Sequence, residues 1–253
     1  NVGDLPAISG DFSHVGALRM DDMNLRSGSN EFLASFSQLR VLDMSENRMT
    51  RMPPAIAQMS QLLSLELTSN RISLTPESAQ QLANHSSLEI LDLSGNPLGI
   101  SPDVSQLVNL RQLDLSNTGI TQWPNGLWAL THIEWANLRN NMIASIPPAV
   151  FEPQWTLGAN RSTTISGNPI DASSRNRIVE YWAQGHSDFG YGPAISHGFN
   201  QIAHNAQLQA AVSDISPWLP LNFSEAQIAA RTQQWQLLQG AGGSVKDFFE
   251  TLV

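Results

Sequence analysis

Residues 88–98 read LEILDLSGNPL, and residues 110–120 read LRQLDLSNTGI. Both segments carry apolar residues at the first, fourth, sixth and eleventh positions, and an amide or hydroxyl side chain at the ninth. The fourth and sixth positions lie two residues apart, which predicts a short strand that points both side chains into a core. The two segments therefore predict one structural unit that recurs along the chain.

The same pattern occurs seven times. Its ninth positions fall at residues 23, 47, 70, 96, 118, 141 and 168, so successive copies lie 22 to 27 residues apart. The first and last copies are weaker, and Met23 in the first offers no hydrogen-bonding side chain. Repetition at this interval indicates a solenoid, in which each turn buries its apolar side chains against the next turn.

The pattern and its interval resemble those of the leucine-rich-repeat superfamily over residues 15–172. The resemblance implies an α/β fold, a horseshoe-shaped solenoid with a parallel β-sheet on its concave side, here followed by an α-helical C-terminal region. The ninth-position Asn is expected to satisfy backbone groups that the turn leaves unpaired. Proline-containing segments at 52–56, 123–124 and 146–148 open the return path, and residues 76–85 predict a short helix.

Four segments are expected along the chain. An N-terminal segment covers residues 1–14, about seven repeats cover 15–172, a capping helix and linker cover 173–198, and a helical region covers 199–253. Ile178, Tyr181 and Trp182 have helical spacing, so residues 173–185 are expected to form a helix that covers the last repeat. The chain begins at Asn1 rather than at a methionine, which suggests a piece of a longer protein.

Composition excludes several classes of function. The 13 basic and 22 acidic residues give a net charge of -9, which disfavours nucleic acid as a partner. The absence of cysteine excludes disulfides, thiolate metal sites and cysteine nucleophiles from these residues. No apolar run approaches the roughly 20 residues of a membrane span. The six histidines lack metal-binding spacing, so we expect no metal, cofactor or catalytic residue here.

The candidate binding residues alternate with the core residues and are expected to face the concave surface. One row contains four consecutive carboxylates about 4.8 Å apart, which would favour a basic protein partner. An alternative is that these residues are merely solvated, since acidic residues are common at this position in the family. The row consists of Arg19, Asp43, Glu66, Asp92, Asp114, Asn137 and Thr164.

Two further rows are expected to flank the carboxylates. Trp135 is the predicted anchor of a partner, because exposed aromatic side chains dominate many interfaces. The alternative is that Trp135 packs against neighbouring strands as a structural plug. The preceding row also includes Val41 and Ile90, and the following row includes Glu46, Asn117, Arg139 and Asn140.

A narrower resemblance concerns the end of the chain. Residues 217–253, with Arg231, Trp235 and Leu238 followed by Ser244, Phe248, Phe249 and Leu252, resemble the first helices of the novel E3 ubiquitin ligase domain. That domain follows leucine-rich repeats in secreted bacterial effectors and in toxin-like proteins of pseudomonads. The resemblance implies a cysteine that carries ubiquitin as a thioester, and no residue here matches it, so this chain alone is expected to be inactive.

The leading hypothesis is a substrate-recognition solenoid of a secreted bacterial ubiquitin ligase, delivered into the host cytoplasm. A rival is a pure binding module of a toxin or surface protein without ligase chemistry. A second rival is a different enzyme whose active site lies outside these residues. The sequence alone leaves the three hypotheses open.

Overall fold

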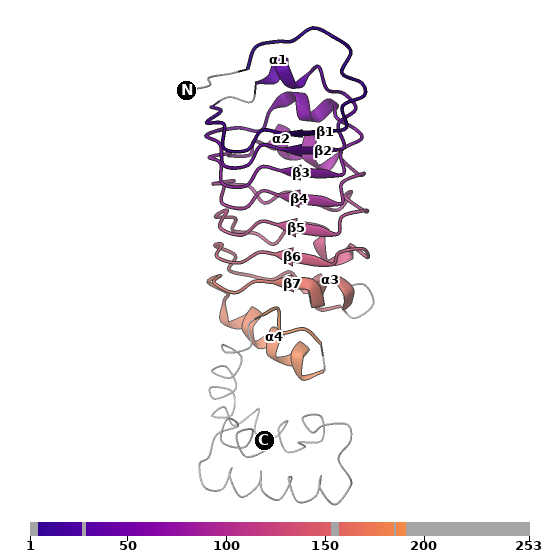
Figure 1. Ribbon diagram of the computed structural model, residues 1–253. Helices are drawn as coiled ribbons and strands as arrows, with labels where there is room; N and C mark the ends of the chain where they lie inside the picture. Colours follow the sequence, from indigo (N-terminus) through magenta and orange to yellow (C-terminus); the bar gives the residue numbers. More distant parts are fainter. Residues whose placement is uncertain (1–4, 27–28, 153–156, 185, 191–253) are drawn as a thin grey trace, which may run out of the picture. The chain divides into compact units, whose positions relative to one another are not determined.

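The computed structural model describes residues 5–26, 29–152, 157–184 and 186–190. Seven parallel strands form one sheet in the order of the chain (Figure 1). This arrangement confirms the predicted leucine-rich-repeat solenoid, including its weak first and last copies. The strands are β1 (Ala17–Arg19), β2 (Val41–Asp43), β3 (Ser64–Glu66), β4 (Ile90–Asp92), β5 (Gln112–Asp114), β6 (Trp135–Asn137) and β7 (Thr163–Thr164).

The core is a column of aliphatic side chains that runs through the sheet. The central residues of adjacent strands are in register, as in the pairs Leu42 with Leu65 and Leu91 with Leu113. All four side chains are fully buried. The residues before and after them in each strand face the opposite way, because successive side chains in a strand alternate. The sheet therefore has one buried side and one side free for a partner.

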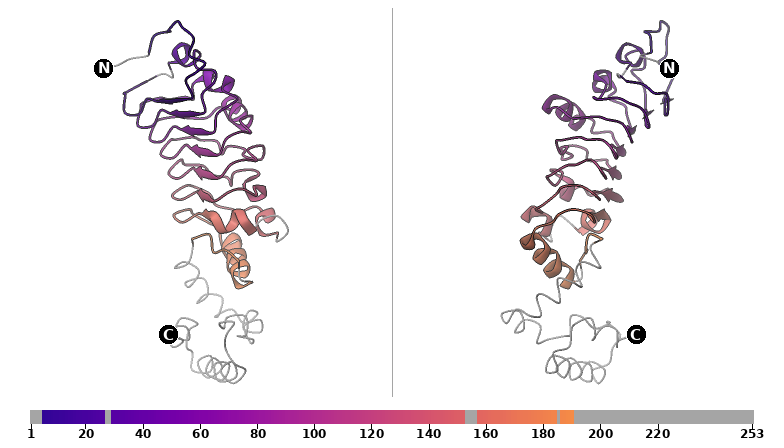
Figure 2. Two further views of the ribbon diagram at one scale, coloured as in Figure 1. Left: turned by 45° about the vertical axis from the view of Figure 1, so that its right-hand side comes forward. Right: turned by 90° about the vertical axis from the view of Figure 1, so that its left-hand side faces the viewer.

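Short helical segments return the chain on the side of the sheet opposite to the free side (Figure 2). Helix α2 (Pro76–Ala83) confirms the helix expected at 76–85, and its capping box is formed by Thr75 and Ser78. The proline-containing segments at 52–56 and 146–148 lead into 3₁₀ helices, which the sequence did not predict. The other helical segments of the repeat region are α1 (Asn30–Leu33), η1 (Pro54–Gln58), η2 (Leu127–Ala129), η3 (Pro148–Phe151) and α3 (Leu157–Ser162).

The ninth-position asparagines bind the backbones of successive repeats together. In Asn96, Oδ1 accepts a bond of 2.9 Å from the amide of Ile72, while Nδ2 donates to the carbonyl oxygens of Leu67 at 2.9 Å and Leu93 at 3.0 Å. One buried side chain thus satisfies backbone groups of its own repeat and of the preceding repeat. The same role is filled by Asn47, Asn70, Asn141 and Asn168.

Thr118 interrupts this series. Its hydroxyl lies within 2.8 Å of the carbonyl oxygen of Leu115 and within 2.9 Å of Oδ1 of Asn141. A hydroxyl has one proton, so it cannot replace both donors of an amide. The amide of Leu98 instead donates to the backbone carbonyl of Thr118 at 3.1 Å. Thr118 therefore retains part of the bonding, as the sequence predicted.

The turn before each ninth position requires a left-handed backbone. The residue directly before it has a φ between 54° and 80° in every repeat from the second to the seventh. At Gly167, where φ is 80°, a Cβ atom would lie 2.2 Å from Oδ1 of Asn140, so a side chain there would displace the exposed Asn140 side chain. The six residues are Glu46, Ser69, Gly95, Asn117, Asn140 and Gly167.

The chain divides into two compact units, and the second begins at Ala172. Within it, α4 (Ala172–Ala183) confirms the helix expected at 173–185. The ring of Tyr181 lies against the rings of His186 and Phe189, with centroids 4.4 Å and 6.0 Å away. The expected capping of the last repeat stays a prediction. Residues 199–253, where the ligase resemblance lies, fall outside the described residues.

Substitution Asn96→Ala is expected to lower the free energy of unfolding by roughly 3 kcal/mol, because it leaves several buried backbone groups without a partner. Asn109→Ala is the matched control, since Nδ2 of this exposed residue donates only to the carbonyl oxygen of Ser86. Urea unfolding followed by circular dichroism measures both changes. Equal losses in the two variants would contradict the role given to the buried amide.

Two glycines separate backbone strain from steric exclusion. Gly126 has a φ of 80°, and a Cβ atom there would lie 2.3 Å from Cα of Ser105. Gly119 has a φ of 70° and open space around the corresponding position. Gly119→Ala should cost about 1 kcal/mol from strain alone, and Gly126→Ala should cost clearly more. Thermal unfolding of both variants tests this order, and the reverse order would contradict it.

Candidate protein-binding surface

The free side of the sheet, here named the sheet face, consists of the first and third residues of the strands. The register places the third residues of β1 to β6 side by side, from Arg19 through Asp43, Glu66, Asp92 and Asp114 to Asn137, and pairs Asn137 with Thr164, the second residue of β7. The predicted carboxylate row is therefore continuous over β2 to β5. All four residues are half-buried, so part of each remains accessible to solvent.

Three of the acidic residues have a structural role that sequence reasoning missed. In Asp43, Asp92 and Asp114, Oδ1 accepts a bond from the backbone amide two residues on, at 3.0, 2.9 and 2.8 Å. The donor is a serine amide each time, so the Asp-x-Ser spacing was the available signal. In Asn137 the amide oxygen accepts the equivalent bond from Arg139 at 3.2 Å. The turn therefore needs the side-chain oxygen but not the negative charge.

The remaining carboxylate oxygens are only partly used. Oδ2 of Asp114 accepts a bond from Nδ2 of Asn137 at 3.1 Å, and Oε1 of Glu66 accepts one from the Ser64 hydroxyl at 3.0 Å. Within the described residues, the ion pairs involve none of the four carboxylates. Nearby like charges on one face repel each other, which favours a positively charged partner.

Trp135 gives the sheet face a large apolar contact. Its side chain is 43% exposed, in contrast to the fully buried Ala136 beside it in β6. The structure thus places Trp135 at the surface rather than in the core. Val41 and Ile90 lie in the same row of first residues and are half-buried. A partner that covers this row would remove apolar surface from water.

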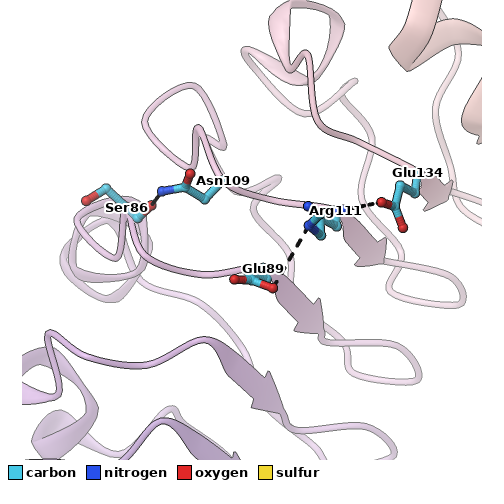
Figure 3. A network of polar contacts seen from close by, with 5 residues as sticks. All are labelled: Ser86, Glu89, Asn109, Arg111 and Glu134. Carbon is cyan, nitrogen blue, oxygen red and sulfur yellow. Dashed lines mark hydrogen bonds and ion pairs between the residues drawn. The ribbon is translucent and has the colours of Figure 1, made fainter.

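Three charged residues lie beside the row of first residues, each directly before β4, β5 or β6 (Figure 3). Nη1 of Arg111 pairs with Oε1 of Glu134, and its Nε lies 4.0 Å from Oε2 of Glu89. All three side chains are about half exposed, so the pairs contribute little stability. Their effect is to hold Arg111 between two acids, away from the carboxylate row.

The row expected after the carboxylates lies in the turns that follow the strands. Glu46, Asn117 and Asn140 occupy the left-handed turn position described above, a conformation that favours Asn but not Glu. Arg139 is exposed, and its Nε donates to the Ser166 hydroxyl at 2.6 Å. The positions two residues after the carboxylates instead carry hydroxyl groups, namely Ser45, Thr68, Ser94 and Ser116. Sequence reasoning missed this row, although the recurring hydroxyl residues were visible.

Other kinds of site were also sought. Among the described residues, no three His, Asp or Glu side chains are grouped so that they could hold a metal ion. In the same part of the chain, every helix is too short or too polar to span a membrane. The sheet face is therefore the candidate site on which the functional argument rests.

Comparisons with known proteins agree on the repeat architecture. A family pattern described as "Leucine rich repeat" matches residues 37–98, and a second with the same description matches residues 109–130. The mouse "Leucine-rich repeat and IQ domain-containing protein 4" is 46% identical over 65 residues, which are 24% of this chain and 11% of that protein. The Arabidopsis "Receptor-like protein 54" is 34% identical over 82 residues, 32% of this chain and 10% of that protein.

One solved structure has a similar fold. The leucine-rich-repeat ectodomain of the Arabidopsis receptor kinase GASSHO1/SCHENGEN3 has a TM-score of 0.55 and 25% identity, covering 67% of this chain and 20% of that chain. A leucine-rich-repeat protein of Leptospira interrogans has a TM-score of 0.47 and 23% identity, covering 67% of this chain and 47% of that chain. This chain thus spans about a tenth of the curated relatives it matches and a fifth of the ectodomain.

Substitution Asp92→Asn should leave the melting temperature unchanged or slightly raised, because the amide oxygen still accepts the bond from Ser94 and one repelling charge is lost. Asp92→Ala removes the acceptor for both the amide and the hydroxyl of Ser94 and should cost about 1 kcal/mol. Differential scanning calorimetry compares the two variants. A large loss with Asp92→Asn would mean that the turn depends on the charge.

Proposed function

We propose that this leucine-rich-repeat solenoid binds another protein on its sheet face. The observation that carries the proposal is the row of four in-register carboxylates, which form no ion pair with any described residue, next to a half-exposed Trp135. Aromatic anchors supply much of the energy of protein interfaces, while complementary charges supply orientation and speed of association. The sheet face offers both on a rigid, backbone-paired scaffold.

The fold itself supports a binding role. The sheet face stays free because core packing uses only the other side of each strand. The Arabidopsis ectodomain of similar fold was solved in complex with CASPARIAN STRIP INTEGRITY FACTOR 2, which makes it a leucine-rich-repeat domain that binds another molecule. The side chains on the sheet face, rather than the fold, decide what this chain binds.

We further infer that the solenoid selects substrates for a secreted bacterial ubiquitin ligase that acts in the host cytoplasm. The support is the resemblance of residues 217–253 to the start of the novel E3 ubiquitin ligase domain, together with its position after the repeats. The alternative is a binding module of a toxin or surface protein without ligase chemistry. In either case the repeats have the same task, which is to hold a protein.

Site-specific crosslinking tests the binding role of the sheet face. A photoreactive phenylalanine analogue is placed at Trp135 in one variant and at Met142 in another. Met142 is the matched control, because it is 58% exposed and lies outside the strands of the same repeat. Adducts with a partner are expected from position 135 and not from position 142. Adducts from position 142 alone would place the binding surface elsewhere.

Affinity for a partner so captured provides the quantitative test. Trp135→Ala should weaken binding about tenfold or more, as expected for a central aromatic anchor. Met142→Ala should change the dissociation constant by less than about twofold, because isolated surface residues outside an interface are nearly neutral. Calorimetric titration of the two variants measures both effects. Equal weakening would contradict the assignment of Trp135 as the anchor.

A ubiquitin-transfer assay tests the ligase inference separately. A protein that contains this chain followed by the ligase domain should form a reducible ubiquitin thioester with a ubiquitin-conjugating enzyme. These 253 residues are the negative control, since they contain no cysteine to carry ubiquitin. Absence of the thioester across a panel of conjugating enzymes would favour the binding module without ligase chemistry.

A further inference from the structure

The spacing of the carboxylate row constrains the shape of a partner. Asp43, Glu66, Asp92 and Asp114 occupy one register position on four adjacent parallel strands. Adjacent strands lie about 4.8 Å apart, so the second, third and fourth carboxylates stand about 4.8, 9.6 and 14.4 Å from the first. A partner that meets all four must present positive charges at nearly the same interval.

The charge of these residues is available to a partner. The turn bonds of Asp43 and Asp92 occupy Oδ1, and no bond to their Oδ2 occurs within the described part of the chain. Oδ2 of Asp114 accepts from Asn137, and Oε1 of Glu66 accepts from Ser64. These donors are neutral, so none of these hydrogen bonds supplies a positive charge to a carboxylate. Asn137 shows that the turn forms without such a charge.

We propose that the sheet face binds an α-helix that carries basic side chains at positions i, i+3, i+7 and i+10. In a helix with a rise of 1.5 Å per residue, these positions lie about 4.5, 10.5 and 15 Å from the first. Each value agrees with the carboxylate spacing to within about 1 Å. The four side chains also lie within an arc of about 80° on one helical face. This inference rests on the proposed function of the sheet face.

Other backbone conformations fit less well. In an extended strand, side chains on one face recur every 6.6 to 6.8 Å or so, which departs from the carboxylate interval by about 2 Å at each step. A polyproline II helix repeats about every 9.3 Å and would meet only alternate carboxylates. The interval of adjacent strands therefore favours an α-helix that lies across the strands.

Trp135 adds an apolar contact to the match between basic side chains and carboxylates. Its strand, β6, follows that of Asp114 in the sheet, and so lies about 19 Å from the strand of Asp43. In the partner helix, residue i+14 lies on the basic face about 21 Å from residue i. Trp135 lies two residues along β6 from the register position of the carboxylate row, about 6.6 Å to one side of it. A long apolar side chain at i+14 would span this offset toward the exposed ring of Trp135. The complete recognition element is a basic helical face with one apolar residue beyond it.

A pair of synthetic peptides tests the inference on the full chain. The matched peptide is an alanine-rich helix of about 18 residues, closed by a lactam on its opposite face, with Arg at i, i+3, i+7 and i+10 and Leu at i+14. The comparison peptide has the same composition and lactam, with the arginines distributed around the helix. Fluorescence anisotropy should show the matched peptide binding at least about tenfold more tightly, and less tightly as salt increases.

Matched variants assign the effect to the sheet face. The variant with Asp43→Asn, Asp92→Asn and Asp114→Asn keeps the turn acceptors and should lose the preference for the matched peptide. The control with Glu31→Gln, Glu77→Gln and Glu180→Gln removes the same charge from exposed residues outside the sheet face. This control should keep the preference for the matched peptide. Circular dichroism verifies that both variants are folded.

Four results would overturn the helix inference. Equal binding of the two peptides, or equal loss in the two variants, would mean attraction by net charge alone. Tighter binding of an extended peptide with the same arginines would exclude a helical partner. Failure of every peptide to bind would reject basic-helix recognition. The proposed function would still be decided by crosslinking at position 135, so the two failures are distinguishable.

Discussion

The buried asparagine amide at the turn of five of the seven repeats is the interaction on which the rest of the structure depends. A chain that turns inward after only three strand residues leaves backbone groups buried without partners, and such groups are costly. The amide supplies an acceptor and two donors in one rigid group, so Asn96 serves both its own repeat and the preceding one. Where Thr118 replaces it, the backbone of the neighbouring repeat changes partner. These bonds fix the interval between repeats and thereby the register of the sheet.

That register determines what the surface can do. Because successive repeats form the same turn, equivalent residues lie in rows across the strands. A residue type that recurs at one position of the repeat therefore forms a continuous row on the surface. The carboxylate row arises in this way from Asp43, Glu66, Asp92 and Asp114. The acidic side chains combine two roles, since one oxygen closes a turn while the charge faces outward. Asn137 separates the roles, because it closes the turn without the charge.

The solenoid fold is shared with proteins of very different organisms and lengths, so the fold alone does not specify a partner. Specificity has to come from the side chains that the fold leaves free. On this chain they form a polar and acidic sheet face with an exposed aromatic side chain, Trp135, in β6. The exposed Arg139 follows β6 in the chain. Arg111 pairs with Glu89 and Glu134, so the ion pairs among the described residues do not involve the carboxylate row.

The sequence by itself determined the repeat, the strand positions, the alignment of the carboxylate row and helix α2, because periodic burial and proline placement are local signals that recur seven times. It did not determine the left-handed turn residues such as Glu46 and Ser69, whose types do not require that conformation. It also left open whether Trp135 is exposed, which depends on packing with side chains from other repeats. Only the tertiary structure showed that Arg111 pairs with Glu89 and Glu134, and that no described residue forms an ion pair with the four carboxylates. Those facts depend on where side chains of different repeats meet, and a linear pattern does not contain that information.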